Sequence, residues 1–202
     1  MFFELYRIMK YLLIAFLLFV TLNVSAQTKI YKVYKGDSEI GQLAAVKVTE
    51  GNGQKTHYQI TSELTVKIII SINSYYTSQV TYVNDVLNSA NAKELRNDDI
   101  KRKTTTEATS NGYNVKTVKE ALSIEGDITF SDCLLQFIEP IGISKIYSES
   151  LGTFATIKEI DKHKYLLTSS NGDKSEYQYQ NGECVYFKYL HPLASIEFRL
   201  QQ

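Results

Sequence analysis

Apolar and polar residues alternate along most of this chain, most regularly over residues 164–200. Two Asn-Gly pairs, Asn171-Gly172 and Asn181-Gly182, separate the alternating runs there. Such a pair predicts a β-hairpin, because a type I′ turn needs positive φ at both central residues, and Asn and Gly tolerate this best. The C-terminal part is therefore predicted to form three or four consecutive antiparallel strands, each with one face toward a core.

The first half of the chain shows the same period of two. Over residues 58–72 the apolar side chains fall on one face, interrupted by Ser62, which predicts a long central strand. Residues 38–49 are also predicted to be extended, with Gly41 at a bulge or at a close approach of two backbones. Residues 75–85 have the composition of a further strand.

Four later segments are less regular. Residues 86–97 fit a strand or a short helix, which periodicity cannot separate over this length, and we predict a strand. Residues 100–110 carry charged or Thr side chains on both faces, which favours a solvated strand near a sheet edge. Residues 113–124 are predicted to be extended. Ser131 and Asp132 are expected to cap a short helical turn over residues 133–137, which Pro140 ends.

Many alternating segments separated by turns, with two prolines in the whole chain, predict an all-β protein. We expect a single large curved antiparallel sheet or incomplete barrel, a meander of about ten or more strands with one short helical segment. A barrel embedded in a membrane is disfavoured, because residues 100–110 offer no apolar face to lipid.

The N-terminus has the pattern of an export signal. Lys10 precedes the apolar run 11–20, and Val24-Ser25-Ala26 places small residues where a signal peptidase reads. The run is far shorter than the roughly 20 residues of a membrane-spanning helix. We predict that residues 1–26 are a signal peptide cleaved between Ala26 and Gln27, and that residues 27–202 form a single antiparallel β domain with no membrane span. Translation could start at Met1 or at Met9.

The charge balance excludes one class of partner. The chain has 22 basic and 22 acidic residues, and removal of Arg7, Lys10 and Glu4 with the signal peptide leaves it near neutral. Because nucleic-acid binding requires a clustered basic excess, we predict no nucleic-acid partner.

Cys133 and Cys184 are the only cysteines. Export would place them in an oxidising compartment, where an even count permits a disulfide between them. Two separate buried thiols are the alternative, because free Cys packs as a small apolar side chain.

No motif of an established catalytic type is present. His57, His163 and His191 lack the spacing of a zinc site, so we predict no metal, no cofactor and no catalytic residue. Glu139 and Glu149 are the least arbitrary carboxylate pair, because they flank the one irregular apolar segment. A capping or turn-bracing role is favoured for them over catalysis.

Tyrosine is unusually frequent, with 15 Tyr against no Trp. Tyr suits a half-buried strand, with its ring packed and its hydroxyl in water, but aromatic residues also line ligand pockets. Large sheets with bulky inward residues commonly enclose ligand space. We predict an apolar cleft, partly covered by residues 134–137. Its candidate ligand-binding residues are Leu134, Phe137, Tyr177, Tyr179 and Phe187.

Four short motifs carry a family resemblance: Ile40-Gly41-Gln42, Phe137-Ile138-Glu139-Pro140, Tyr147-Ser148-Glu149 and Tyr177-Gln178-Tyr179-Gln180-Asn181-Gly182. With them, nearly the whole chain after residue 26 resembles a family of exported proteins from Bacteroidetes-type Gram-negative bacteria, a domain of unknown function. That family is loosely similar to periplasmic curved-sheet proteins such as lipoprotein carriers. The resemblance implies a periplasmic or envelope-associated protein and supplies no catalytic residue.

Three functions remain open at this point. The first is a non-catalytic periplasmic protein that binds an apolar or amphiphilic ligand, such as a lipid. The second is an envelope interaction or assembly protein without a small ligand, and the third is an enzyme of unrecognised type. An open apolar cleft would favour the first, a closed packed core the second, and a cleft with convergent carboxylates or His the third.

Overall fold

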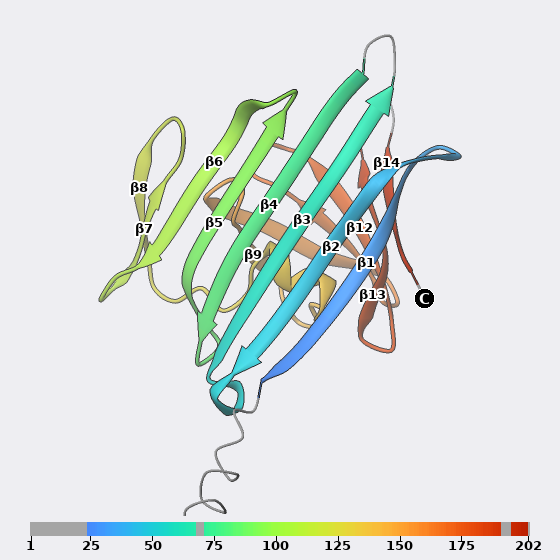
Figure 1. Cartoon of the computed structure of the whole chain (residues 1–202). Helices are drawn as coiled ribbons and strands as arrows, with labels where there is room; N and C mark the ends of the chain where they lie inside the picture. The colour runs from blue at the N-terminus through green and yellow to red at the C-terminus, as the bar shows by residue number, and fades with distance from the viewer. Residues whose placement is uncertain (1–23, 68–70, 191–194, 202) are drawn as a thin grey trace, which may run out of the picture.

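A computed structural model describes residues 24–67, 71–190 and 195–201, which form one antiparallel sheet of 14 strands curved around a short inner segment (Figure 1). The strands are β1 (Ser25–Lys35), β2 (Ser38–Glu50), β3 (Lys55–Lys67), β4 (Ser71–Val83), β5 (Val86–Arg96), β6 (Asp99–Ala108), β7 (Gly112–Lys116), β8 (Ala121–Glu125), β9 (Lys145–Ser148), β10 (Thr153–Asp161), β11 (Lys164–Thr168), β12 (Lys174–Gln180), β13 (Glu183–Leu190) and β14 (Ile196–Leu200). Two 3-10 turns, η1 (Gly51–Gly53) and η2 (Asp132–Gln136), are the helical elements of this part of the chain. Within the described ranges, no helix has the length and apolar character needed to cross a membrane.

The strand order is β8-β7-β6-β5-β4-β3-β2-β1-β14-β13-β12-β11-β10-β9. Strand β1 joins the two halves, because it pairs with β2 on one side and with β14 on the other. Figure 1 shows the N-terminal strands in front, the orange and red C-terminal strands behind them, and η2 in gold between. The all-β prediction of one unclosed antiparallel sheet is therefore confirmed.

The C-terminal meander pairs in sequence order from β11 to β14, as predicted. Asn181 and Gly182 have φ of 53° and 79°, which is the type I′ arrangement expected of them. The prediction for Asn171-Gly172 is wrong, because of this pair only Gly172 has positive φ. The Asn171 side chain accepts a hydrogen bond from the Asp173 N–H at 3.2 Å, which favours a longer loop over a two-residue turn.

Several boundaries in the first half differ from the prediction. The strand expected over residues 58–72 ends at Lys67, and Ile72 belongs to β4, where it pairs with Val66. Residues 86–97 do form a strand, β5. The expected single run over residues 113–124 is instead the β7–β8 hairpin, because the Thr117 side chain and backbone bond to Glu120 and reverse the chain. The predicted signal peptide before Val24, residues 68–70 and His191 lie outside the described residues.

Gly41 has both predicted features. Ile40 is an extra residue in β2 opposite the Val33/Tyr34 step of β1, which is a β-bulge. A Cβ atom on Gly41 would lie 2.0 Å from the backbone oxygen of Glu63, so β2 and β3 approach each other closely at this point. Only glycine fits there.

Strand β6 differs from the solvated strand expected over residues 100–110. Thr104 and Thr106 are buried and face the opposite half of the sheet. Thr104 Oγ1 donates to the Ser150 carbonyl at 2.9 Å, and Thr106 Oγ1 shares a 2.7 Å hydrogen bond with the Tyr147 hydroxyl. These side chains hold the two halves together although β8 and β9 do not pair.

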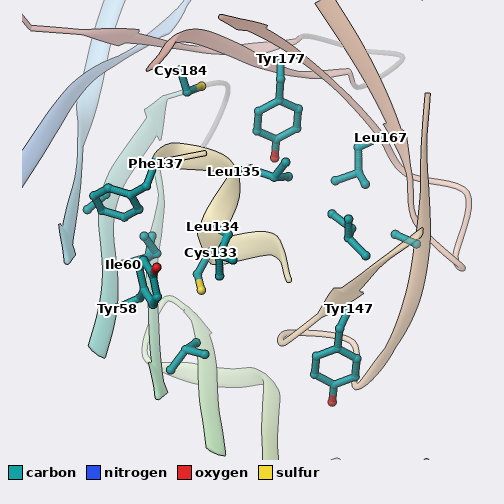
Figure 2. Close-up of a cluster of buried hydrophobic side chains, with 14 of the residues drawn as sticks. Tyr58, Ile60, Cys133, Leu134, Leu135, Phe137, Tyr147, Leu167, Tyr177 and Cys184 are labelled. Atoms are coloured by element: carbon teal, nitrogen blue, oxygen red, sulfur yellow. The ribbon is translucent and has the colours of Figure 1, made fainter. Parts of the chain in front are cut away.

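Residues 128–137, called the inner segment below, run inside the curved sheet. Leu134, Leu135 and Phe137 are buried in the core, where Figure 2 shows them between the strands of the two halves. Buried tyrosine hydroxyls from the surrounding strands bond to the segment: Tyr82 donates to Ser131 Oγ at 2.7 Å, and Tyr179 to the Leu135 carbonyl at 2.8 Å.

Tyr113 accepts from the Ile128 N–H at 3.1 Å. The expectation that tyrosine hydroxyls face water is therefore wrong for these residues. The inner segment is not a strand of the sheet and has a single isolated bridge to Tyr147, so its other buried backbone groups must be satisfied in other ways.

Candidate functional site

A cavity of about 200 Å³ lies beside the inner segment, between the two halves of the sheet. The apolar part of its buried lining includes Leu43, Ile60, Leu167 and Phe187. These side chains come from β2, β3, β11 and β13, so both halves of the sheet contribute.

An aromatic stack forms part of that wall. The Tyr177 and Phe187 rings lie 5.3 Å apart at 12°, and Phe187 stacks on Phe198 at 4.2 Å and 8°. The stack follows from register, because Tyr177, Phe187 and Phe198 are direct cross-strand partners in β12, β13 and β14. In Figure 2 the Tyr177 ring extends from its strand toward the inner segment.

Two carboxylates form the polar end of the cavity. Asp132 begins η2, and Glu149 follows β9. Glu149 is 1% exposed, and its Oε1 accepts a hydrogen bond from the Cys133 N–H at 3.0 Å. The other oxygen of Glu149, Oε2, and Asp132 Oδ1 are both buried without a hydrogen-bond partner. Within the described ranges, neither carboxylate has an ion-pair partner.

Burial raises the pKa of both carboxyl groups. The pKa of Asp132 lies well above its ordinary value, first because of burial and second because of the neighbouring Glu149 charge, against which a hydrogen bond from Ser148 acts. The pKa of Glu149 is also raised by burial, while the Ser131 hydroxyl and the Cys133 N–H oppose the rise. Like charges in one buried site resist double ionisation, so the pair favours a state with a single negative charge.

Two tyrosines flank the carboxylates. Tyr76 and Tyr177 line the same cavity, and the charges of Glu149 and Asp132 contribute to a pKa well above the ordinary value at both phenols, after the larger effect of burial. Aromatic rings beside carboxylates in a partly apolar cavity make a site for a group that is both cationic and carbon-rich.

The cavity reaches half-exposed residues at one rim. Arg102 lies on the β6 side, and its Nη1 is 3.5 Å from Glu94 Oε2. Asp173 and Tyr189 lie on the β12–β13 side, where burial first and their mutual hydrogen bond second raise the pKa of Tyr189. This rim is the polar, half-exposed part of the cavity lining.

The five residues predicted from sequence to bind a ligand fall into two groups. Tyr177 and Phe187 line the cavity. Leu134, Phe137 and Tyr179 do not. Leu134 and Phe137 are core residues of the inner segment, and Tyr179 holds that segment through its hydroxyl. From the predicted covering segment, Gln136 lines the cavity.

The carboxylate pair nominated from sequence is not the pair that the fold brings together. Glu139 lies in a separate cluster, where its Oε1 is 2.8 Å from His163 Nδ1 and 2.9 Å from the Tyr165 hydroxyl. The bracing role expected of Glu149 is confirmed by its bond to the Cys133 N–H. Ser131, expected to cap this turn, makes no side-chain cap bond, and its hydroxyl accepts a hydrogen bond from Tyr82 instead.

Sequence reasoning missed Asp132 as a partner for Glu149. The two lie far apart in sequence and meet only because the inner segment folds back into the sheet. An acidic residue directly before the buried apolar run 133–137 was the available signal, since such a residue is carried inside with that run.

The cysteines and histidines form no further site. Cys133 and Cys184 are free thiols, both buried at different places in the core (Figure 2), as in the alternative of two separate thiols. No group of three or more His, Cys, Asp or Glu side chains suited to a metal ion occurs among the described residues.

Comparisons with known proteins identify the family of the chain and a protein of similar fold. No curated protein matches the sequence. Among solved structures, the chain is similar to a crystal structure of a beta-barrel-like protein of the domain of unknown function DUF1849 from Brucella abortus, with 11% identity and a TM-score of 0.52. The match covers 90% of this chain and 98% of that one, and at this identity it shows the fold alone. A family model, "Domain of unknown function (DUF6134)", matches residues 31–201, and the chain therefore belongs to the DUF6134 family.

Proposed function

We propose that this protein is an exported, non-catalytic binding protein that holds a small apolar or amphiphilic ligand between the two halves of its sheet. The observation that carries the proposal is the cavity, in which an apolar wall around Phe187 faces two buried carboxylate oxygens without partners. Buried polar atoms are nearly always hydrogen-bonded in folded proteins, so these oxygens indicate a missing donor.

Water alone is a poorer occupant. A buried water needs two to four polar partners, and the side of the cavity formed by Leu43, Ile60 and Leu167 offers none. An amphiphile satisfies both ends of the cavity, because its carbon skeleton covers the apolar wall and its polar group meets the carboxylates.

The volume limits the ligand. About 200 Å³ is less than the roughly 300–1,000 Å³ of pockets that enclose drug-sized molecules. A whole lipid does not fit, and the ligand is a small amphiphile or one end of a larger molecule. The lipid or amphiphile predicted from sequence is therefore limited to a small molecule, or to the part of a larger one that enters the cavity.

Native mass spectrometry tests the proposal. Protein purified gently from the cell envelope should carry a small molecule that is lost on denaturation, and an environment-sensitive dye should compete with it. Protein that is consistently empty and binds no such dye would refute the binding function. Conversion of the bound molecule to a product would move the assignment to catalysis by the Asp132–Glu149 pair.

The same sample tests export to a Gram-negative periplasm or envelope. The mature protein should begin at Gln27. Strand β1 begins at Ser25, so cleavage there removes only its first two residues, whose partners are Thr49 and Val48. A retained segment over residues 11–20 would contradict export by a cleaved signal peptide.

An envelope interaction protein is the second candidate. Among the described strands, β8 ends the sheet and pairs with β7 alone. The other end strand, β9, is covered by the inner segment through a 2.9 Å bond from the Tyr147 N–H to the Phe130 carbonyl. An open edge can accept a strand from another protein. A photoreactive residue at exposed Ser123 should cross-link to a partner if this function holds, while one at exposed Asp37 should not.

A further inference from the structure

We infer that the ligand carries an amine, which Asp132 and Glu149 receive as a cation while its short apolar body packs on the Tyr177–Phe187 stack. This inference rests on the proposed binding function and names the chemical class of the ligand.

The first step concerns the hydrogen-bond donors that the two carboxyl groups need. A carboxyl pair with one negative charge holds one proton, so three of its four oxygens can only accept hydrogen bonds. Asp132 Oδ1 and Glu149 Oε2 are both buried without a hydrogen-bond partner. An ammonium group has up to three N–H donors, whereas an alcohol has one. A group with several donors can bond both oxygens at once, which a hydroxyl cannot do.

The second step is charge. The buried pair favours a single negative charge, and no cation of the described chain reaches it. Lys29, the buried lysine, lies 3.4 Å from Glu183, and Arg102 at the rim is already paired with Glu94. A buried charge without a partner is costly, so a singly charged cation is the ligand group that the site is built to accept.

The third step is the surroundings of the charge. The rings of Tyr76 and Tyr177 flank the carboxylates, and the Tyr177 ring stacks on the Phe187 ring. Aromatic faces attract organic cations, most strongly where water is excluded. A hydrated metal ion would gain little from these rings or from the apolar wall, so the arrangement favours an amine on a carbon skeleton.

Three probes that share a phenyl ring on a short carbon chain and differ in their polar group test the amine inference. They are phenethylamine, phenethyl alcohol and phenylacetate. Isothermal titration calorimetry on the mature protein should give an affinity for the amine at least tenfold higher than for the alcohol. Phenylacetate should bind more weakly than either, because its charge repels the carboxylates. Preferential binding of phenylacetate would overturn the inference and point to Arg102 as the recognition residue.

Variants make the test specific to the two carboxylates. Asp132→Asn and Glu149→Gln should each reduce amine affinity at least tenfold and leave alcohol affinity within twofold. Glu139→Gln is the matched control, because Glu139 is also a shielded carboxylate, 5% exposed, but lies outside the cavity with His163. Amine affinity should be unchanged in this control.

Folding is checked for each variant by circular dichroism. If Glu149→Gln fails to fold because the Cys133 N–H bond is weakened, Asp132→Asn carries the test, since Asp132 does not make that bond. Equal binding of amine and alcohol to the wild type would overturn the amine class and leave the binding function standing. If no probe binds but protein from the envelope carries a molecule without an amine, the amine inference is refuted and the binding function stands. If no probe binds and that protein is also empty, both are refuted.

Discussion

Neutralising Asp132 should stabilise the unliganded protein, which is the opposite of what loss of a structural residue does. Asp132 Oδ1 is buried without a hydrogen-bond partner and lies beside Glu149, so its charge is opposed by burial and by a like charge. Asp132→Asn removes the ionisable group with almost no change in volume. Binding residues that await a ligand commonly lower stability in this way.

The magnitude follows from proton uptake. A carboxyl group that the folded protein holds neutral costs about 1.36 kcal/mol for each pH unit above the ordinary Asp pKa of about 3.9. At pH 7 the upper limit is therefore about 4 kcal/mol. An amide N–H that finds no acceptor takes back about 1–3 kcal/mol. We expect a net gain for Asp132→Asn of about 1–3 kcal/mol, or roughly 2–12 °C in Tm for a chain of this size.

The pH dependence has a defined sign. Because the folded-state pKa of Asp132 is raised, the folded protein binds more protons than the unfolded chain above about pH 3.9, and the wild type loses stability as pH rises. The stability difference between Asp132→Asn and the wild type should be smallest near pH 4 and should widen with pH until the folded-state pKa is passed.

Urea unfolding of both proteins between about pH 4 and pH 8 measures this difference. Asp37→Asn is the control, because Asp37 is exposed on the β1–β2 turn, and its effect should stay within about 0.5 kcal/mol at every pH. The reasoning is refuted if Asp132→Asn is less stable than the wild type at pH 7, or if the difference does not change with pH.

The remaining predictions concern the scaffold. Gly182→Val should cost about 1–3 kcal/mol in urea unfolding, because the site is open but its φ is 79°; an unchanged Tm would contradict the turn assignment. Gly41→Ala should cost more, although Ala is smaller, because its Cβ would meet backbone at 2.0 Å; equal costs would argue against the close approach of β2 and β3. Tyr179→Phe should cost about 1–3 kcal/mol by leaving a carbonyl of the inner segment unpaired, and a neutral result would mean that the hydroxyl is not a support. Burial raises the pKa of the Cys133 thiol, and that of Cys184 to about 12, so both should resist iodoacetamide until the protein unfolds; rapid labelling of the folded protein would refute their burial.

The local parts of the fold were predictable because they depend on neighbours in sequence. Period-two alternation located most strands, and Asn181-Gly182 formed the expected turn because both residues adopt positive φ. Asn171-Gly172 is the same residue pair but forms a different turn, because the Asn171 side chain bonds to the Asp173 N–H. The Thr117–Glu120 reversal was missed for a similar reason, since it depends on a Thr hydroxyl rather than on Gly or Pro.

The candidate site was predictable only on its sheet side. Tyr177 follows from alternation in β12, because period two fixes which of its side chains face inward. In β13 a bulge breaks the alternation, so that Cys184 and Phe187, three positions apart, are both buried. The carboxylate end depends on where the inner segment lies, and no local pattern determines that. Glu139 and Glu149 looked equivalent in sequence, but only Glu149 follows a strand whose end meets η2 inside the sheet.

The buried tyrosines link the sheet to the inner segment. A buried segment that is not a strand of the sheet must still have its carbonyl and N–H groups satisfied, and Phe at Tyr113 or Tyr179 would leave some of them unpaired. Tyr supplies a large ring for the core and a hydroxyl for the segment. Tyr113 and Tyr179 bond to its backbone groups, and Tyr82 bonds to the Ser131 hydroxyl. These hydroxyls therefore also fix the position of Asp132, because Asp132 belongs to the segment that they hold. An interior filled by a non-sheet segment therefore explains these buried tyrosines, and the cavity lies beside that segment.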